Sequence, residues 1–92
     1  MKKWEIRFSE EALKALKKMD RSTIVLIDSW IKKHLENCED PRSFGKPLVA
    51  NLKNKWRYRI GDYRMLCEIK DNVLIVLVVN IGHRSDVYKQ YF

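Results

Sequence analysis

The chain has 92 residues, which is enough for one domain with a single modest core and too few for two. Apolar residues make up 46% of the sequence, so wholesale disorder is excluded. Lys and Arg outnumber Asp and Glu by 19 to 12, which gives a net charge of +7. A balance this basic predicts an acidic partner, such as nucleic acid, an anionic membrane surface or an acidic protein.

The sequence carries no pattern typical of secretion or membrane insertion. Met1 leads directly into a charged segment rather than into an apolar leader. The longest apolar run, Val73–Val79, has seven residues, whereas a bilayer span needs about 20. The two cysteines, Cys38 and Cys67, have neither the spacing of metal ligands nor that of a disulfide framework. We therefore expect a cytoplasmic protein with free thiols, no metal, no cofactor and no membrane contact.

The first half of the chain predicts one strand and two helices. Lys3–Phe8 alternates polar and apolar residues, as a half-buried strand does. Ser9 is placed to cap a short helix, and a second helix begins near Thr23 and ends by Asn37. Residues 38–47 contain both prolines of the chain and one of its glycines, which predicts a loop.

From Lys55 onward the pattern changes to a period of two. Residues 55–60 and 63–69 alternate, and Gly61-Asp62 between them predicts a two-residue hairpin with a type II′ turn. The almost wholly apolar run Val73–Ile81 predicts a central strand that is covered on both faces. Residues 85–88 predict a short C-terminal helix or tail. The expected fold is α+β, a single domain over residues 1–92, with two N-terminal helices packed on one face of a mostly antiparallel four-stranded sheet.

The predicted hairpin fixes which of its residues lie opposite each other. Tyr58 faces Met65 and Arg59 faces Arg64, so the aromatic and most aliphatic side chains share the face that the helices cover. Arg57 and the two facing arginines fall on the other, open face of the hairpin.

This open face places like charges directly opposite each other, which destabilises a sheet by a fraction of a kcal/mol up to about 1. A bound polyanion would offset that repulsion, because guanidinium groups match phosphate oxygens with paired hydrogen bonds. The alternative is a solvated basic face whose arginines pair with Glu68 or Asp62.

The end of the chain holds further candidates for chemistry. If the tail folds back over the sheet, Arg84 and Tyr88 reach the open face of the hairpin. Nearby guanidinium groups favour a phenolate, so the pKa of such a tyrosine falls from about 10 and it becomes a workable general base for a ribose hydroxyl. His83 is a turn residue or a second catalyst, and His34, late in a helix, is structural or solvated.

These residues also carry a resemblance to a known family. The chain resembles the RelE/ParE superfamily of bacterial toxins, and is more similar to its RelE branch. The resemblance covers nearly the whole chain and rests on WRYRIGDYR at residues 56–64 together with GHR at 82–84 and VY at 87–88. DPR at 40–42 and GKPL at 45–48 add to it.

The resemblance implies a toxin of a type II toxin-antitoxin system. Such a toxin is a ribosome-dependent, metal-independent endoribonuclease that cuts messenger RNA in the ribosomal A site. The 2′-hydroxyl attacks the adjacent phosphate and leaves a 2′,3′-cyclic phosphate and a free 5′-hydroxyl. The partners implied are mRNA, the rRNA of the A site and a cognate acidic antitoxin, with which the otherwise monomeric toxin forms a hetero-oligomer.

Roles of single residues also follow from the resemblance. Arg64 matches the arginine that stabilises the pentavalent phosphate, Arg84 matches the one at the end of the last strand, and Tyr88 matches the tyrosine that orients or deprotonates the 2′-hydroxyl. The general acid stays open between His83 and the positions of Arg57 and Arg59, where relatives often carry lysine, because arginine keeps the charge but donates a proton poorly. The residues expected to bind RNA are Arg57, Arg59, Lys55, Lys53 and Lys46.

Two other functions fit the same sequence features. The ParE branch shares the fold but poisons DNA gyrase and cuts no RNA. A non-catalytic RNA- or ribosome-binding module would use the same basic face.

Overall fold

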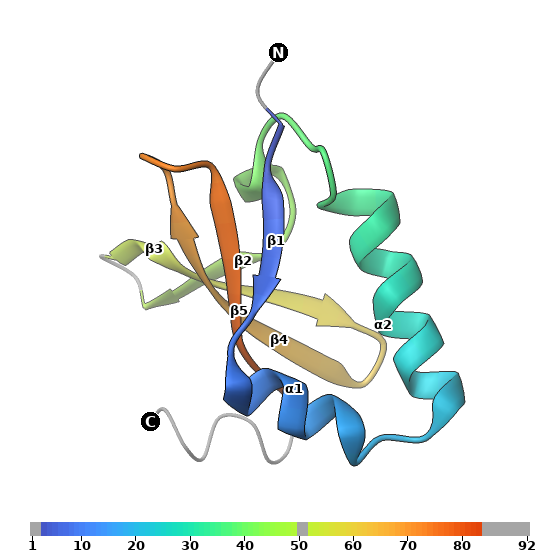
Figure 1. The fold of residues 1–92 in the computed structure, drawn as a ribbon. Helices are drawn as coiled ribbons and strands as arrows, with labels where there is room; N and C mark the ends of the chain where they lie inside the picture. Colours follow the sequence, from blue (N-terminus) through green and yellow to red (C-terminus); the bar gives the residue numbers. More distant parts are fainter. Residues whose placement is uncertain (1–2, 50–51, 84–92) are drawn as a thin grey trace.

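The computed structural model describes residues 3–49 and 52–83 of the chain, and these form a sheet with two helices on one side (Figure 1). The elements in chain order are β1 (Glu5–Phe8), α1 (Glu10–Lys17), α2 (Arg21–His34), a 3-10 helix (Pro41–Ser43), β2 (Lys46–Val49), β3 (Leu52–Ile60), β4 (Tyr63–Lys70) and β5 (Ile75–His83). The predicted α+β class is confirmed. A predicted C-terminal helix at residues 85–88 lies outside the described residues.

Both helices begin at side chains that cap them. The Ser9 hydroxyl accepts a hydrogen bond from the Ala12 amide (3.0 Å) and donates one to Val79 O (2.7 Å), which ties the start of α1 to β5. Asp20 caps α2 by accepting from the Thr23 amide, and this hydrogen bonding lowers the pKa of the Asp20 carboxyl. The second helix therefore begins at Arg21, two residues before the predicted start, because Asp20 caps it.

The sheet has five strands in the order β1-β5-β4-β3-β2, so the predicted four-stranded sheet was wrong by one strand. The extra strand is β2, whose first two residues belong to the predicted loop at residues 38–47. It pairs antiparallel with β3. The sheet is also mixed, because β1 runs parallel to β5 while the other three pairings are antiparallel.

Strand β5 lies between β1 and β4, as expected of a central strand. The prediction that both of its faces are covered holds only in part, because the face away from the helices is mostly half-buried. Val76 and Val78 are fully buried, while the residues between and beside them are half-buried. A register shift leaves Val79 outside the pairing with β4, since Val78 pairs with Cys67 and Asn80 with Leu66. This bulge exchanges the faces of all later residues in the strand.

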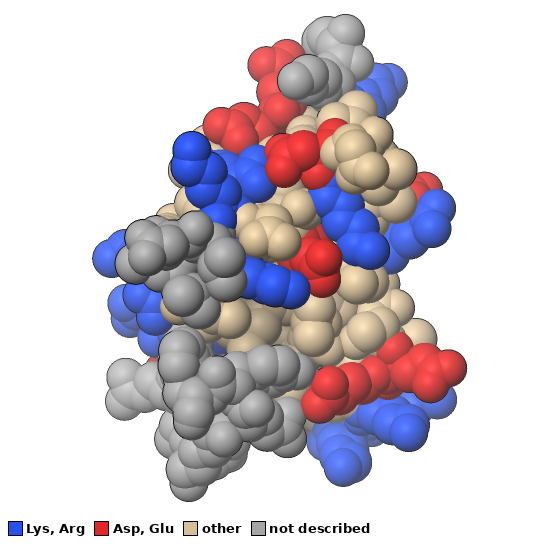
Figure 2. Space-filling view, turned by 90° about the vertical axis from the view of Figure 1, so that its left-hand side faces the viewer, with Lys and Arg blue, Asp and Glu red and all other residues tan. Residues whose placement is uncertain are grey.

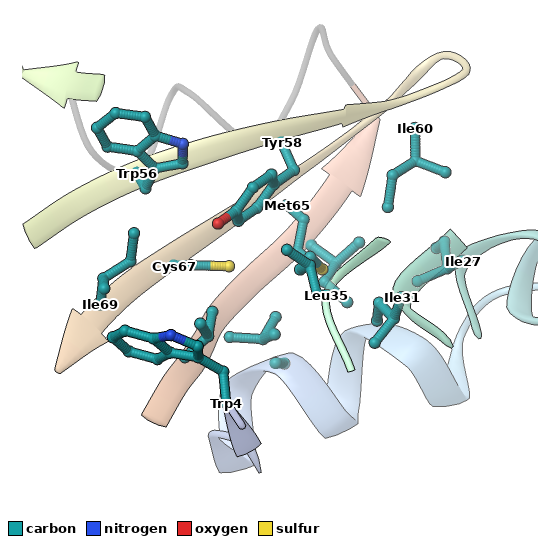
Figure 3. Packing of buried hydrophobic residues seen from close by; sticks show 14 residues of the cluster. Trp4, Ile27, Ile31, Leu35, Trp56, Tyr58, Ile60, Met65, Cys67 and Ile69 are labelled. Carbon is teal, nitrogen blue, oxygen red and sulfur yellow. The ribbon is translucent and has the colours of Figure 1, made fainter. Parts of the chain in front are cut away.

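The core lies between the helices and the inner face of the sheet (Figure 3). Its largest fully buried side chain is Tyr58, whose hydroxyl donates to Pro41 O at 2.6 Å. Burial raises the pKa of both Tyr58 and the thiol of Cys67. The remaining core members that Figure 3 labels are Trp4, Ile27, Ile31, Leu35, Trp56, Ile60, Met65 and Ile69.

Candidate nucleic-acid interface

The register of the β3–β4 hairpin is the one that the sequence predicts. Arg59 lies opposite Arg64 and Tyr58 opposite Met65. The φ of Gly61 is positive, at 59°, and the φ of Asp62 is not positive. A type II′ turn requires this combination. The helix-facing side chains of residues 55–69 are buried except for the half-buried Tyr63, and the arginines point to the other side of the sheet.

These arginines line a groove on the open face of the sheet. The groove has a volume of about 270 Å³ and is lined by Gly45, Lys46, Arg57, Arg59 and Arg64. We call it the arginine groove. Figure 2 views the molecule from the side away from α2 and shows Lys and Arg side chains on both halves of this view, with Asp and Glu side chains among them. Among the described lining residues, all four that have a side chain are cationic, so the groove is suited to bind an anion.

Arg64 is held at the end of the groove by the hairpin backbone. Its Nη1 donates to Gly61 O (3.2 Å) and to Tyr63 O (3.0 Å). Both bonds use the same nitrogen, and among the described residues Nη2 and Nε donate none. A guanidinium anchored in this way can offer its remaining N–H groups to a phosphate with little loss of side-chain entropy.

The opposite wall of the groove is the start of β2, which lies unusually close to β3. A Cβ atom on Gly45 would lie 2.2 Å from Arg57 O, and the φ of Gly45 is +74°. Only glycine fits both the space and the backbone conformation. The next residue, Lys46, then pairs with Arg57 across the two strands and completes the cationic lining.

A set of hydrogen bonds fixes the path of residues 40–44, which lead into this wall. Arg42 forms a two-bond ion pair with Asp71 (2.8 and 2.9 Å) and donates from Nε to Lys53 O, and these bonds to Asp71 raise the pKa of Arg42. The Trp56 indole N–H donates to Phe44 O at 2.6 Å. The loop is thus bonded to the strand whose other face carries Arg57 and Arg59.

Comparison with known proteins identifies the fold and the family. Residues 6–88 match the family described as the ParE toxin of the type II toxin-antitoxin system parDE. The chain belongs to the RelE/ParE superfamily of toxins. It is 28% identical to Toxin RelG of Mycobacterium tuberculosis over 95% of this chain and 98% of that protein. It is 30% identical to a putative RelE-like toxin protein of Escherichia coli over 94% of this chain and 90% of that one.

Solved structures of RelE toxins share the architecture. The toxin-antitoxin complex RelBE2 of M. tuberculosis superposes with a TM-score of 0.78 at 28% identity, over 94% of this chain and 97% of that one. The isolated E. coli RelE toxin gives a TM-score of 0.69 at 21% identity, over 96% and 94% of the two chains, which supports the fold. This RelE/ParE-family chain is therefore a type II toxin by family and has the fold of RelE toxins.

The structure brings together four of the predicted site residues and separates others. Arg57, Arg59, Arg64 and Lys46 line the arginine groove of the toxin. Lys55 and Lys53 are not among the described lining residues, and Lys55 pairs with Glu68 at 3.3 Å. Arg84 and Tyr88, which the resemblance makes catalytic, lie outside the described residues.

His83 does not join the arginines. It pairs with Tyr63 across β4 and β5, on the face opposite Arg64, and its ring lies edge-on to the Tyr63 ring with 5.9 Å between centroids. The cause is the bulge at Val79, because an unbroken period of two from Val76 and Val78 would have placed His83 on the open face.

Two residues on the open face are buried, and the sequence did not predict their burial. Leu66 is 2% exposed but is not part of the core cluster, and Asn80, its partner on β5, is 7% exposed. The Asn80 side-chain oxygen accepts from the Ile81 amide at 2.9 Å, next to the bulge. Asparagine within an apolar run is the signal for such a break in the strand.

Two further properties concern the described residues only. They contain no group of three or more His, Cys, Asp or Glu side chains arranged to hold a metal ion. Neither helix within residues 3–49 and 52–83 has the length and apolar character needed to cross a membrane.

Proposed function

We propose that this toxin is an endoribonuclease that cuts messenger RNA in the A site of the ribosome. The observation that carries the proposal is the arginine groove, in which Arg59 and Arg64 lie directly opposite each other. Facing like charges cost stability in a sheet, and a phosphate bound between them would turn this repulsion into attraction. Action on ribosomes places the protein in the cytoplasm.

The chemistry proposed is attack of the 2′-hydroxyl on the adjacent phosphate. The bond from O2′ to phosphorus forms, the bond from phosphorus to O5′ breaks, and the products are a 2′,3′-cyclic phosphate and a 5′-hydroxyl. Arg64 stabilises the negative charge of the pentavalent phosphate, Arg84 adds a further positive charge, and Tyr88 takes the 2′-hydroxyl proton. Fixed guanidinium groups aimed at the developing charge supply the largest share of such a rate enhancement.

Binding is assigned to the cations of the groove and of the strand beside it. Arg57 and Arg59 would contact phosphates, and phosphate contacts position RNA without reading its sequence. The ribosome would then present the message in the A site, and bases unstacked there are open to recognition.

The partner proposed for regulation is an acidic antitoxin that folds on binding. The similar RelBE structures of M. tuberculosis and E. coli are those of toxin-antitoxin complexes. On this toxin, an apolar groove of about 240 Å³ runs between α1 and α2, and Leu13 and Val25 at this groove are 45% and 54% exposed. An amphipathic helix with acidic flanks fits such a groove on a chain of charge +7. Copurification of the product of a small neighbouring gene with this toxin tests the pairing.

Single-turnover cleavage on programmed ribosomes, with saturating protein, tests the nuclease assignment. Arg64→Ala should lower the cleavage rate about 100-fold or more, the scale of losing one donor to a developing anion. Tyr88→Phe keeps the ring and removes the hydroxyl, and it should also cost about 100-fold or more. Ribosome binding should stay nearly unchanged in Tyr88→Phe. Near wild-type cutting by both variants would contradict the roles given to these residues.

The family match supports a second candidate function. The matched family carries the name of the ParE toxin, and a ParE-like toxin would inhibit DNA gyrase and would not cut RNA. Gyrase-linked DNA breaks after expression, without codon-linked cuts in mRNA, would support that alternative. A protein that binds ribosomes and cuts neither nucleic acid would instead be a binding module.

A further inference from the structure

Breaking the bond from phosphorus to O5′ leaves an alkoxide that must be protonated. Few of the described residues that line the arginine groove can donate this proton. Arg57, Arg59 and Arg64 keep their protons, because a guanidinium is not deprotonated in proteins. Gly45 has no side chain. The remaining lining residue, Lys46, carries an ammonium group, which can give up a proton.

The position of Lys46 is built into the fold. Gly45 brings the start of β2 so close to β3 that a Cβ atom there would overlap Arg57 O, and Lys46 follows directly and pairs with Arg57. Residues 40–44 are themselves bonded to β3 and to Asp71, so this wall has little freedom to move. Among the described residues, the Lys46 ammonium has no hydrogen bond or ion pair that would hold it away from the groove.

The other described candidates are directed elsewhere. The His83 ring packs against Tyr63 on the helix side of the sheet. Lys55 points to the open face but pairs with Glu68 at 3.3 Å and is absent from the lining of the groove. Lys53 is likewise absent from the lining.

Resting on the nuclease function proposed above, we propose that Lys46 is the general acid of the reaction. Its ammonium donates a proton to O5′ as the bond from phosphorus to O5′ breaks, while the proton of the 2′-hydroxyl leaves to the general base. The RNA ends as a 2′,3′-cyclic phosphate and a 5′-hydroxyl, and the neutral amine of Lys46 regains its proton from water. Lys46 thus performs the proton transfer, and the arginines stabilise the charge.

The experiment uses two messages that differ in one atom. One carries the ordinary phosphodiester in the A-site codon, at the linkage that the wild-type protein cuts, and the other carries sulfur in place of O5′. A thiolate leaves without protonation, since thiols ionise near pKa 8.5, so the sulfur linkage does not need an acid. Wild type, Lys46→Ala and Lys46→Arg are compared by single-turnover cleavage on ribosomes. Lys70→Arg, at the far end of β4, serves as the control.

Both Lys46 variants should cut the ordinary linkage about 100-fold more slowly than wild type, within the range for general acid catalysis. Both should cut the sulfur linkage within a few fold of wild type, and Lys70→Arg should match wild type on both messages. Thermal unfolding of each variant should match wild type, because Lys46 is exposed.

Three results would overturn the assignment. Full activity of Lys46→Arg on the ordinary linkage would mean that Lys46 supplies only charge. Equal loss on the two linkages would mean that Lys46 binds or positions the phosphate. A wild-type protein that cuts neither message would remove the nuclease function and this role with it, whereas the first two results would leave that function intact.

Discussion

The two faces of the β3–β4 hairpin are built from alternate residues of the same strands, and they differ in how far their polar groups are satisfied. On the helix side, Tyr58 is fully buried with its hydroxyl bonded to Pro41 O, and Trp56 donates to Phe44 O. On the open side, Arg59 is exposed and lies opposite Arg64, another cation.

This difference separates stability from function. Burial of aromatic side chains with paired polar atoms stabilises the fold, whereas facing cations oppose it. The facing cations of the open face therefore contribute little to folding, and their presence is explained by what they bind. Substitutions of buried residues on the helix side should accordingly lower stability. Substitutions of the facing arginines should leave stability intact and weaken RNA binding.

The largest effect is expected on the helix side. Tyr58→Ala should lower the free energy of unfolding by about 4 kcal/mol, because it empties a fully buried aromatic site between β3 and α2. Urea unfolding followed by tryptophan fluorescence measures this change. Tyr58→Phe is the matched control and should cost about 1–3 kcal/mol, since it leaves Pro41 O buried without its donor. A loss below about 1 kcal/mol for Tyr58→Ala would contradict this account of the helix side.

A smaller loss of stability is expected for a substitution at Gly45, in the wall of the arginine groove. Gly45→Ala should cost about 2 kcal/mol or more, because alanine is strained at a φ of +74° and its Cβ would overlap Arg57 O. Gly61→Ala is the control, since its φ is +59° while its Cβ would meet only Leu26 Cδ2 at 3.7 Å. Strain alone should cost about 1 kcal/mol there. Thermal unfolding of both variants checks the difference, and equal losses would mean that the close approach of β2 to β3 has no effect.

The hairpin could be predicted because its signals are local. Alternation over residues 55–60 and 63–69 and the Gly61-Asp62 turn together define the register and place Arg57, Arg59 and Arg64 on one face. The capped start of α1 at Ser9 is equally local.

What the sequence did not predict depends on distant partners or on a break in periodicity. Strand β2 is four residues long and contains Pro47, and it becomes a strand because β3 offers it an edge. The ion pair of Arg42 with Asp71 joins residues 29 apart, and nothing near either residue indicates it. His83 lies on the helix side of the sheet because one residue of β5 bulges out of the pairing with β4.

The smallest effect on stability, and the one that best separates the two faces, is expected for Arg59→Ala. Removing one of two facing cations should raise the free energy of unfolding by a few tenths of a kcal/mol at low salt. The gain should disappear near 1 M salt, where the Debye length falls to about 3 Å. A double-mutant cycle with Arg64→Ala isolates the repulsion, because the second substitution should bring no further gain once the first has removed its partner.

The same variant should bind RNA more weakly, because it neutralises fewer phosphates. For single-stranded RNA, the slope of log affinity against log salt should become shallower by about 0.7 for each phosphate that the protein no longer neutralises. Lys70→Ala, on the same face but far from the groove, should leave that slope unchanged. A loss of stability above about 1 kcal/mol in Arg59→Ala would show that this arginine supports the fold. Its exposure and its like-charged neighbour would then need another explanation, because the open face would be stabilising the sheet as the helix side does.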